Sequence, residues 1–152
     1  MIRKAEPKDI SRIAEILVFT KRMKYRSIFH NDEYSFNGLQ VVKVAGEFKD
    51  PKLLSKVWVY DDGIVKGMIH LEGKEIAELY VDYFFWKEGI GSKLVEFAKE
   101  KSDAKFVWIL EKNDDAIRFY VTHGFKLNGK RQLEEGTPEF IVMLERDLNY
   151  ET

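Results

Sequence analysis

The chain has 152 residues, of which 45% are hydrophobic and 34% charged, and its 25 basic and 26 acidic side chains leave a net charge of −1. This balance lacks the basic bias of a general nucleic-acid or membrane-surface binder, and the length predicts a single domain over residues 1–152. The absence of cysteine excludes disulfides, thiolate catalysis and cysteine-based zinc sites. We find no signal peptide or membrane span, so we expect a cytoplasmic protein.

The first third of the chain predicts one strand and two helices. Residues 2–5 are apolar and basic in a short extended pattern, and Pro7 and Asp9 are typical of the first turn of a helix. The apolar stripe of that helix is formed by Ile10, Ile13, Ala14 and Leu17. A second helix is expected over residues 21–29, and residues 30–56 show no clear periodicity.

From Val57 onward strands dominate, and two helices follow later. Strands are predicted over residues 57–60, 64–71, 76–81, 106–110, 125–127 and 139–144, and helices over residues 89–101 and 114–123. Asp61-Asp62-Gly63 is a hairpin signal between the first two of these strands. The order predicts an α/β (α+β) fold with a mixed, mostly antiparallel sheet of six or seven strands and helices on both faces.

The segment from Glu78 to Ser92 carries the clearest functional signal. A buried strand runs into a turn with Gly89 and Gly91, and a helix follows directly. Such a turn aims several amides, with the positive end of the helix dipole behind them, at one point, so it is suited to a phosphate or pyrophosphate. Plain turn glycines are the alternative. A Rossmann dinucleotide site fails on spacing, because Trp86 stands where a glycine is required.

A second element, Glu111 to Phe125, supplies a partner for this turn. Asn113 and Tyr120 are seven residues apart, two helical turns, and therefore lie on nearly the same face. Asn113 is also a favoured helix N-cap, and Tyr120 also fits a core aromatic, so these alternatives stay open.

Together these motifs resemble the GNAT superfamily of N-acetyltransferases over nearly the whole chain. The matching stretches are I-R-K-A-x-x-x-D-I-x-x-I, L-Y-V-D, E-G-I-G-S-K-L and N-D-D-A-I-R-F-Y-x-x-x-G-F. The third resembles the acetyl-CoA signature Gln/Arg-x-x-Gly-x-Gly/Ala. The resemblance implies a GNAT-like fold in which the strands ending at Val81 and Leu110 are adjacent and parallel and splay to admit acetyl-CoA.

The resemblance also implies where acetyl-CoA, the co-substrate, binds, with its pyrophosphate over the amides of residues 87–92. The implied cofactor-binding residues are Leu79, Val81, Lys87, Glu88, Gly89, Ile90, Gly91, Ser92 and Asn113. The chain departs from the family at Trp86, where Gln or Arg is common. The backbone cradle does not depend on that side chain, and the neighbouring Lys87 is our candidate for the missing charge.

The implied reaction is direct acetyl transfer to a primary amine within a ternary complex. Tyr120 is expected to donate a hydrogen bond or proton to the departing thiolate, because a phenol has a pKa of about 10 and a thiol one of about 8.5. An amine with a pKa of about 10.4 needs a base, and Glu75, Glu78 and Glu111 are candidates. On a strand Glu75 and Glu78 point to opposite faces, so at most one of them can serve, and we choose Glu78 because it is closer to the cofactor turn. A solvated carboxylate or a water chain are the alternatives.

Several questions stay open at this level. A non-catalytic acyl-CoA-binding or regulatory module on the same fold is the alternative function, and a longer acyl chain is an alternative donor. We expect the acceptor on the side bordered by residues 21–29 and 134–138, where the nearby aromatics are Tyr25, Phe29, Tyr34 and Phe36. The sequence does not determine which amine is the acceptor, and it leaves open whether the protein forms a homodimer. The histidines His30, His70 and His123 lack metal-ligand spacing, so no metal site is expected.

Overall fold

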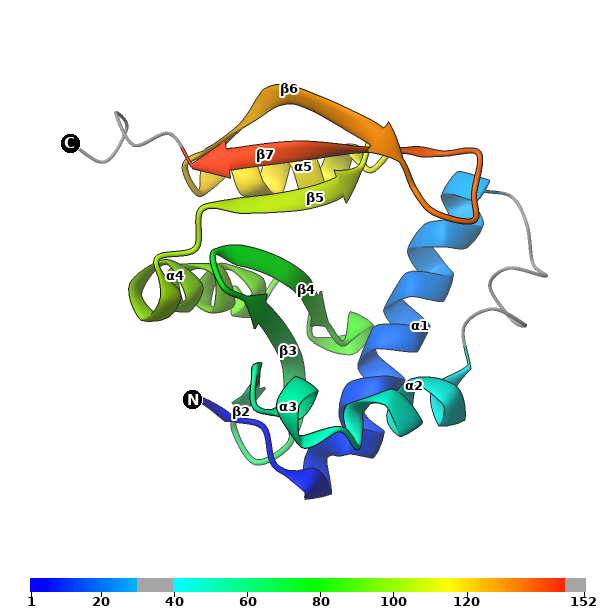
Figure 1. Cartoon of the computed structure of the whole chain (residues 1–152). Coiled ribbons are helices and arrows are strands. Elements are labelled where there is room, and N and C mark those ends of the chain that lie inside the picture. The colour runs from blue at the N-terminus through cyan, green and yellow to red at the C-terminus, as the bar shows by residue number, and fades with distance from the viewer. Residues whose placement is uncertain (30–39, 147–152) are drawn as a thin grey trace.

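The computed structural model describes residues 1–29 and 40–146, which contain a seven-stranded sheet in the order β1-β2-β3-β4-β5-β7-β6 (Figure 1). The strands are β1 (Ile2–Lys4), β2 (Val57–Asp61), β3 (Val65–Glu72), β4 (Glu75–Val81), β5 (Phe106–Leu110), β6 (Phe125–Leu133) and β7 (Phe140–Arg146). All neighbours pair antiparallel except β4 and β5, which are parallel. The predicted mixed, mostly antiparallel sheet is confirmed.

The helices differ from the prediction in the first third of the chain. They are α1 (Ile10–Phe29), α2 (Val41–Phe48), α3 (Pro51–Leu54), α4 (Ile90–Ser102) and α5 (Asp114–Thr122), with 3-10 turns η1 (Pro7–Asp9) and η3 (Tyr83–Phe85). The expected break near residue 21 is wrong, because no proline or glycine interrupts α1. Helices α2 and α3 occupy part of the stretch for which periodicity gave no prediction. Strand β6 is longer than predicted because its residues after Phe125 are exposed, which removes the apolar alternation.

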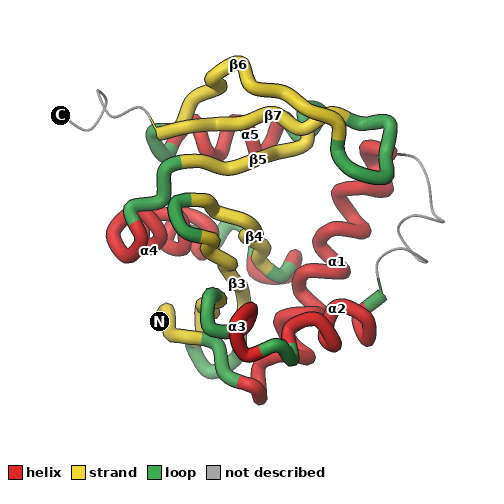
Figure 2. The backbone as a smooth tube through the Cα atoms, in the orientation of Figure 1, coloured by secondary structure: helices red, strands yellow, loops and turns green. Residues whose placement is uncertain are grey.

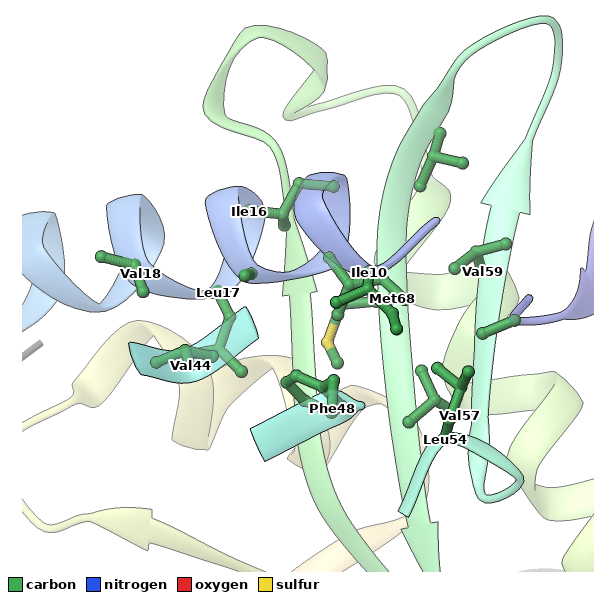
Figure 3. Close-up of a cluster of buried hydrophobic side chains, with 14 residues drawn as sticks. Ile10, Ile16, Leu17, Val18, Val44, Phe48, Leu54, Val57, Val59 and Met68 are labelled. Atoms are coloured by element: carbon green, nitrogen blue, oxygen red, sulfur yellow. The ribbon is translucent and has the colours of Figure 1, made fainter. Parts of the chain in front are cut away.

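Helices cover both faces of the sheet, and each face has its own core. On one face α1, α2 and α3 pack against β2 and β3, through buried side chains that include Leu17, Phe48, Val59 and Met68 (Figure 3). On the other face α4 and α5 pack on the sheet. Alternate residues serve opposite cores: Met68 belongs to the first core and its neighbour Ile69 to the second.

A close approach sets the position of α4. A Cβ built on Gly67 of β3 would lie 3.2 Å from Ile90 Cγ2 and 3.2 Å from the Tyr80 carbonyl oxygen. A side chain at this point would force the first turn of α4 or the neighbouring strand to move by a few tenths of an ångström, so the glycine favours this close packing. The helix then begins beside the end of β4, where the predicted turn is located.

A β-bulge in β4 opens the sheet. In the β3–β4 register His70 pairs with Glu78 but Leu71 pairs with Ile76, which leaves Ala77 as an extra residue. Bulges bend the strand that contains them. The parallel pairing of β4 with β5 stops at Ile76, and beyond it the two strands diverge toward α1 (Figures 1 and 2). The expectation that these strands are adjacent, parallel and splayed is therefore confirmed.

The same bulge corrects one of our interpretations. Glu78 pairs with His70 and Glu75 pairs with Glu72, and His70 and Glu72 are two residues apart on β3, joined by a 2.8 Å hydrogen bond. Because paired residues point to the same face, Glu75 and Glu78 share a face. The prediction of opposite faces is wrong, since it assumed a regular strand.

Candidate functional site

The diverging ends of β4 and β5 frame a cavity of about 450 Å³. The predicted site residues that line it are Glu78, Leu79, Val81, Lys87, Gly89, Ile90, Gly91, Ser92, Asn113 and Tyr120. Glu88 is not among the lining residues, and its carboxylate lies 3.5 Å from the Lys66 ammonium. The structure thus brings together all the predicted residues except Glu88, while their roles in binding and catalysis stay predictions.

The turn between β4 and α4 has the backbone that the glycine signal indicated. Gly89, the N-cap of α4, has φ 79° and ψ 12°, and Lys87 has φ 73°. Asp82 holds the start of the turn: it accepts hydrogen bonds from the Phe84 amide at 2.9 Å and from the Arg12 guanidinium of α1 at 2.5 Å. The first amides of a helix have no intrahelical partner, and residues 90–92 line the cavity. These amides are therefore available to an anion.

Trp86 is built into the wall of the cavity. Its indole Nε1 donates a 2.8 Å hydrogen bond to the Val81 carbonyl, and its ring meets the Tyr83 ring edge-on, with centroids 4.9 Å apart. The Lys24 ammonium of α1 lies 5.0 Å from the Trp86 ring centroid and 4.0 Å from the Asp115 carboxylate of α5. Lys24 was not among the predicted site residues, because no local pattern in the sequence links α1 to this turn.

A chain of side chains stands behind the first turn of α4. Ser92 Oγ lies 3.0 Å from His123 Nε2, and His123 Nδ1 lies 2.8 Å from a Glu96 carboxylate oxygen. Burial alone would raise the pKa of Glu96, but the hydrogen bonds from His123 and Lys99 hold that pKa below its usual value. His123 is therefore a half-buried residue that holds the Ser92 hydroxyl through this contact.

Asn113 and Tyr120 each have the structural role that the sequence left open, and both also line the cavity. Asn113 Oδ1 accepts a 3.2 Å hydrogen bond from the Ala116 amide, so it caps α5 while also lining the cavity. Tyr120 is only 4% exposed and packs against Phe119 and Phe125, with ring centroids 5.1 and 5.5 Å away.

The Tyr120 hydroxyl is chemically available. Within residues 1–29 and 40–146 it makes no hydrogen bond, although it borders the cavity. Burial raises the pKa of this phenol strongly, and the nearby Glu78 charge raises it further. A neutral phenol with a free O–H can donate a hydrogen bond to an anion that forms in the cavity.

The three candidate bases have different surroundings. Glu78 lines the cavity, and its carboxylate lies 3.3 Å from the Lys21 ammonium of α1. Glu111 is held by Arg131 through two hydrogen bonds of 2.7 and 3.0 Å and does not line the cavity. Glu75 does not line it either, and burial, assisted by the Glu72 charge, raises its pKa. Position therefore favours Glu78.

Part of the expected acceptor region cannot be placed. Tyr34 and Phe36 lie outside the described residues, as do the side chains of Tyr25 and Phe29. Among the residues that the structure does describe, no helix is long and apolar enough to cross a bilayer. The same residues contain no group of three or more His, Asp or Glu side chains placed to hold a metal ion.

Comparison with known proteins gives matches in sequence and in fold. Residues 54–127 match the family model of the acetyltransferase (GNAT) domain. The chain is 29% identical over 72 residues to the peptidyl-lysine N-acetyltransferase YiaC of Escherichia coli K12, a match that covers 46% of this chain and 49% of YiaC. The chain thus spans about half the length of the curated relatives that it matches.

Solved structures match nearly the whole chain at low sequence identity. The apo form of YjaB from Escherichia coli superposes with a TM-score of 0.73 at 22% identity, covering 95% of both chains. The PaiA N-acetyltransferase of Thermoplasma acidophilum, solved with coenzyme A, superposes with a TM-score of 0.65 at 18% identity, covering 95% of this chain and 98% of PaiA. These similarities establish a shared fold.

Proposed function

We propose that this chain, which matches the GNAT acetyltransferase family in sequence over residues 54–127 and shares its fold, moves the acetyl group of acetyl-CoA directly to a primary amine. The observation that carries the proposal is the opening between β4 and β5. It joins the free amides of the α4 turn, Asn113 and Tyr120 on one side of the sheet to Glu78 on the other. A donor and an acceptor can therefore meet within the sheet, each from its own face.

The cavity fits acetyl-CoA in its chemistry. The amides of residues 87–92 and the α4 dipole suit a pyrophosphate, and no atom lies within 4 Å of a Cβ built on Gly89. Asn113 and the backbone of Leu79 offer donors and acceptors to the amide-bearing arm of the cofactor, whereas the Val81 carbonyl already accepts the hydrogen bond from Trp86. The fold neighbour PaiA was solved with coenzyme A, which supports the same assignment here.

Acetyl-CoA supplies a thioester whose carbonyl carbon bonds to the acceptor nitrogen as the bond to sulfur breaks. Tyr120 would donate its hydroxyl hydrogen to the developing thiolate. Because burial raises the pKa of this phenol far above that of a thiol, donation of a hydrogen bond is favoured over complete proton transfer. Glu78 would accept the proton that the amine loses. The chain has no cysteine, so a cysteinyl intermediate is excluded and direct transfer is the simplest route.

The acceptor that we propose to test first is a lysine side chain in a peptide. YiaC is a peptidyl-lysine N-acetyltransferase, which makes this amine the first candidate. An incoming ammonium would compete with Lys21 for the Glu78 carboxylate, because these two groups are now 3.3 Å apart. We therefore expect acceptor binding to separate this ion pair.

The test is a CoA-release assay with acetyl-CoA against lysine peptides, free amino acids, polyamines and aminoglycosides. We expect release with at least one amine class and a large loss in the Tyr120→Phe variant. Calorimetry with CoA provides the control. Binding of CoA without release in any reaction would indicate a non-catalytic acyl-CoA-binding module, and the absence of CoA binding would refute the proposal.

A further inference from the structure

We propose that Lys24 is a further cofactor-binding residue, which gives the CoA pyrophosphate the positive charge that Trp86 cannot supply. This inference rests on the proposed function and names a residue that the family signature does not include. The signature commonly has Gln or Arg at the position of Trp86, so the usual side-chain contact to the pyrophosphate is lost in this chain. The structure brings a lysine from α1 to the same place.

The Trp86 ring fixes the position of the Lys24 ammonium. The indole is held by its hydrogen bond to the Val81 carbonyl and by the Tyr83 ring. The ammonium lies 5.0 Å from the ring centroid, within the range of a cation–π contact. Residue 86 directly precedes the first amide of the cradle, and Lys24, Trp86 and the cradle residues line one cavity. The tryptophan thus serves as a platform that keeps a cation beside the anion site.

The present partner of Lys24 can release it at little cost. The Lys24–Asp115 distance of 4.0 Å is long for an ion pair, and the Asp115 side chain is 74% exposed. Asp115 also pairs with Arg118 at 2.5 Å, so it keeps a cation when Lys24 turns toward a pyrophosphate. Exposed ion pairs of this kind contribute little, whereas a diphosphate offers several anionic oxygens.

Lys87 is the competing source of charge. It is exposed, it lines the cavity, and within the described parts of the chain no ion pair holds it. However, its backbone is left-handed at φ 73°, and among the described residues no ring or carboxylate contacts its side chain. Lys24 is more ordered by its contacts, so we assign the charge to Lys24.

The experiment measures CoA and pantetheine binding by titration calorimetry for Lys24→Met and Lys87→Met. The matched control is Lys8→Met, which also removes one lysine from a weak ion pair, here with Glu6 at 3.4 Å. Lys8 does not line the cavity, and it precedes the start of α1, whereas Lys24 lies about four turns into the helix. A rescue variant combines Lys24→Met with Trp86→Arg, which restores the side chain common in the family.

We expect Lys24→Met to weaken CoA binding roughly tenfold or more, the size of a hydrogen bond to a charged group. Pantetheine, which lacks the phosphates, should bind the variant and the wild type equally, Lys8→Met should bind CoA normally, and Trp86→Arg should recover most of the loss. Unchanged CoA affinity in Lys24→Met, a loss only in Lys87→Met, or an equal loss for pantetheine would overturn the assignment to Lys24. Failure of the wild type to bind CoA would instead overturn the proposed function itself.

Discussion

Replacement of Gly89 by alanine tests whether the turn before α4 holds the cofactor. Gly89 has φ 79° and ψ 12°, a left-handed conformation that residues with a side chain rarely adopt. An added methyl group would meet no atom within 4 Å. The variant therefore changes the backbone preference of one residue without creating a steric clash within the protein.

The magnitude follows from the backbone conformation. A left-handed conformation costs an L-residue roughly 1–2 kcal/mol. Residues 87–89 are exposed, so the turn is free to relax toward ordinary backbone angles when no ligand is bound. CoA binding must then restore the left-handed conformation, and the same cost reduces affinity by about 5- to 30-fold, since 1.4 kcal/mol is tenfold.

Calorimetry with CoA and thermal denaturation together measure this effect. Gly73→Ala is the matched control, because Gly73 is also left-handed at φ 59°, and no atom lies within 4 Å of its added Cβ. It lies in the β3–β4 turn, at the opposite end of β4 from Val81. The control should lower Tm by a few degrees, as expected for about 1 kcal/mol in a chain of this size, and leave CoA affinity unchanged.

A Gly89→Ala protein with both normal CoA affinity and normal Tm would show that the left-handed turn does not hold the cofactor. A loss of CoA affinity in the Gly73→Ala control would also contradict the reasoning, because it would mean that the effect spreads through the fold rather than acting at the turn.

Three further predictions concern catalysis and acid stability. Tyr120→Phe should lower kcat by up to about 10⁴-fold while CoA affinity changes little. A variant with the turnover of the wild type would show that Tyr120 acts only in packing. Glu78→Gln should move the pH–rate profile to higher pH if this carboxylate is the base, and an unmoved profile would assign proton removal to water. The two hydrogen bonds from Arg3, at 2.8 and 3.0 Å, hold the pKa of Asp9 below its usual value, so its contribution to stability is complete above the unfolded pKa and is lost as pH falls through the folded one. Asp9→Asn should therefore flatten the acid limb of a urea-denaturation series between about pH 5 and pH 2, and an unchanged limb would show that other carboxylates control it.

Two parts of the fold that follow from local sequence were predicted correctly. The strand–turn–helix around Gly89 and the Asn113 cap are determined within a few residues, so their positions could be derived without the tertiary structure. Helices α2 and α3 could not be predicted, because they are short and are stabilised mainly by the core that they share with α1.

The contacts that complete the site were missed because they join distant segments. His123 reaches Ser92 from the end of α5, and Lys24 reaches Trp86 from α1. Each of these four residues fits an ordinary helix or turn position in the sequence. Their partnership depends on how the helices pack, which no periodicity encodes.

The extra residue Ala77 has a consequence for how this strand can vary. Up to the bulge the even-numbered Ile76 faces α4, and after it the odd-numbered Leu79 and Val81 do so. Deletion of Ala77 would remove the bulge and restore a single parity: Ile76, Leu79 and Val81 would still face α4 and Glu78 the opposite face, but the straightened strand could extend its pairing with β5 across the opening. Substitutions in this stretch change one side chain at a time, whereas loss of this one residue would straighten the strand up to Val81 and close the opening. The number of residues between Glu75 and Val81, more than their identity, is what this strand has to preserve.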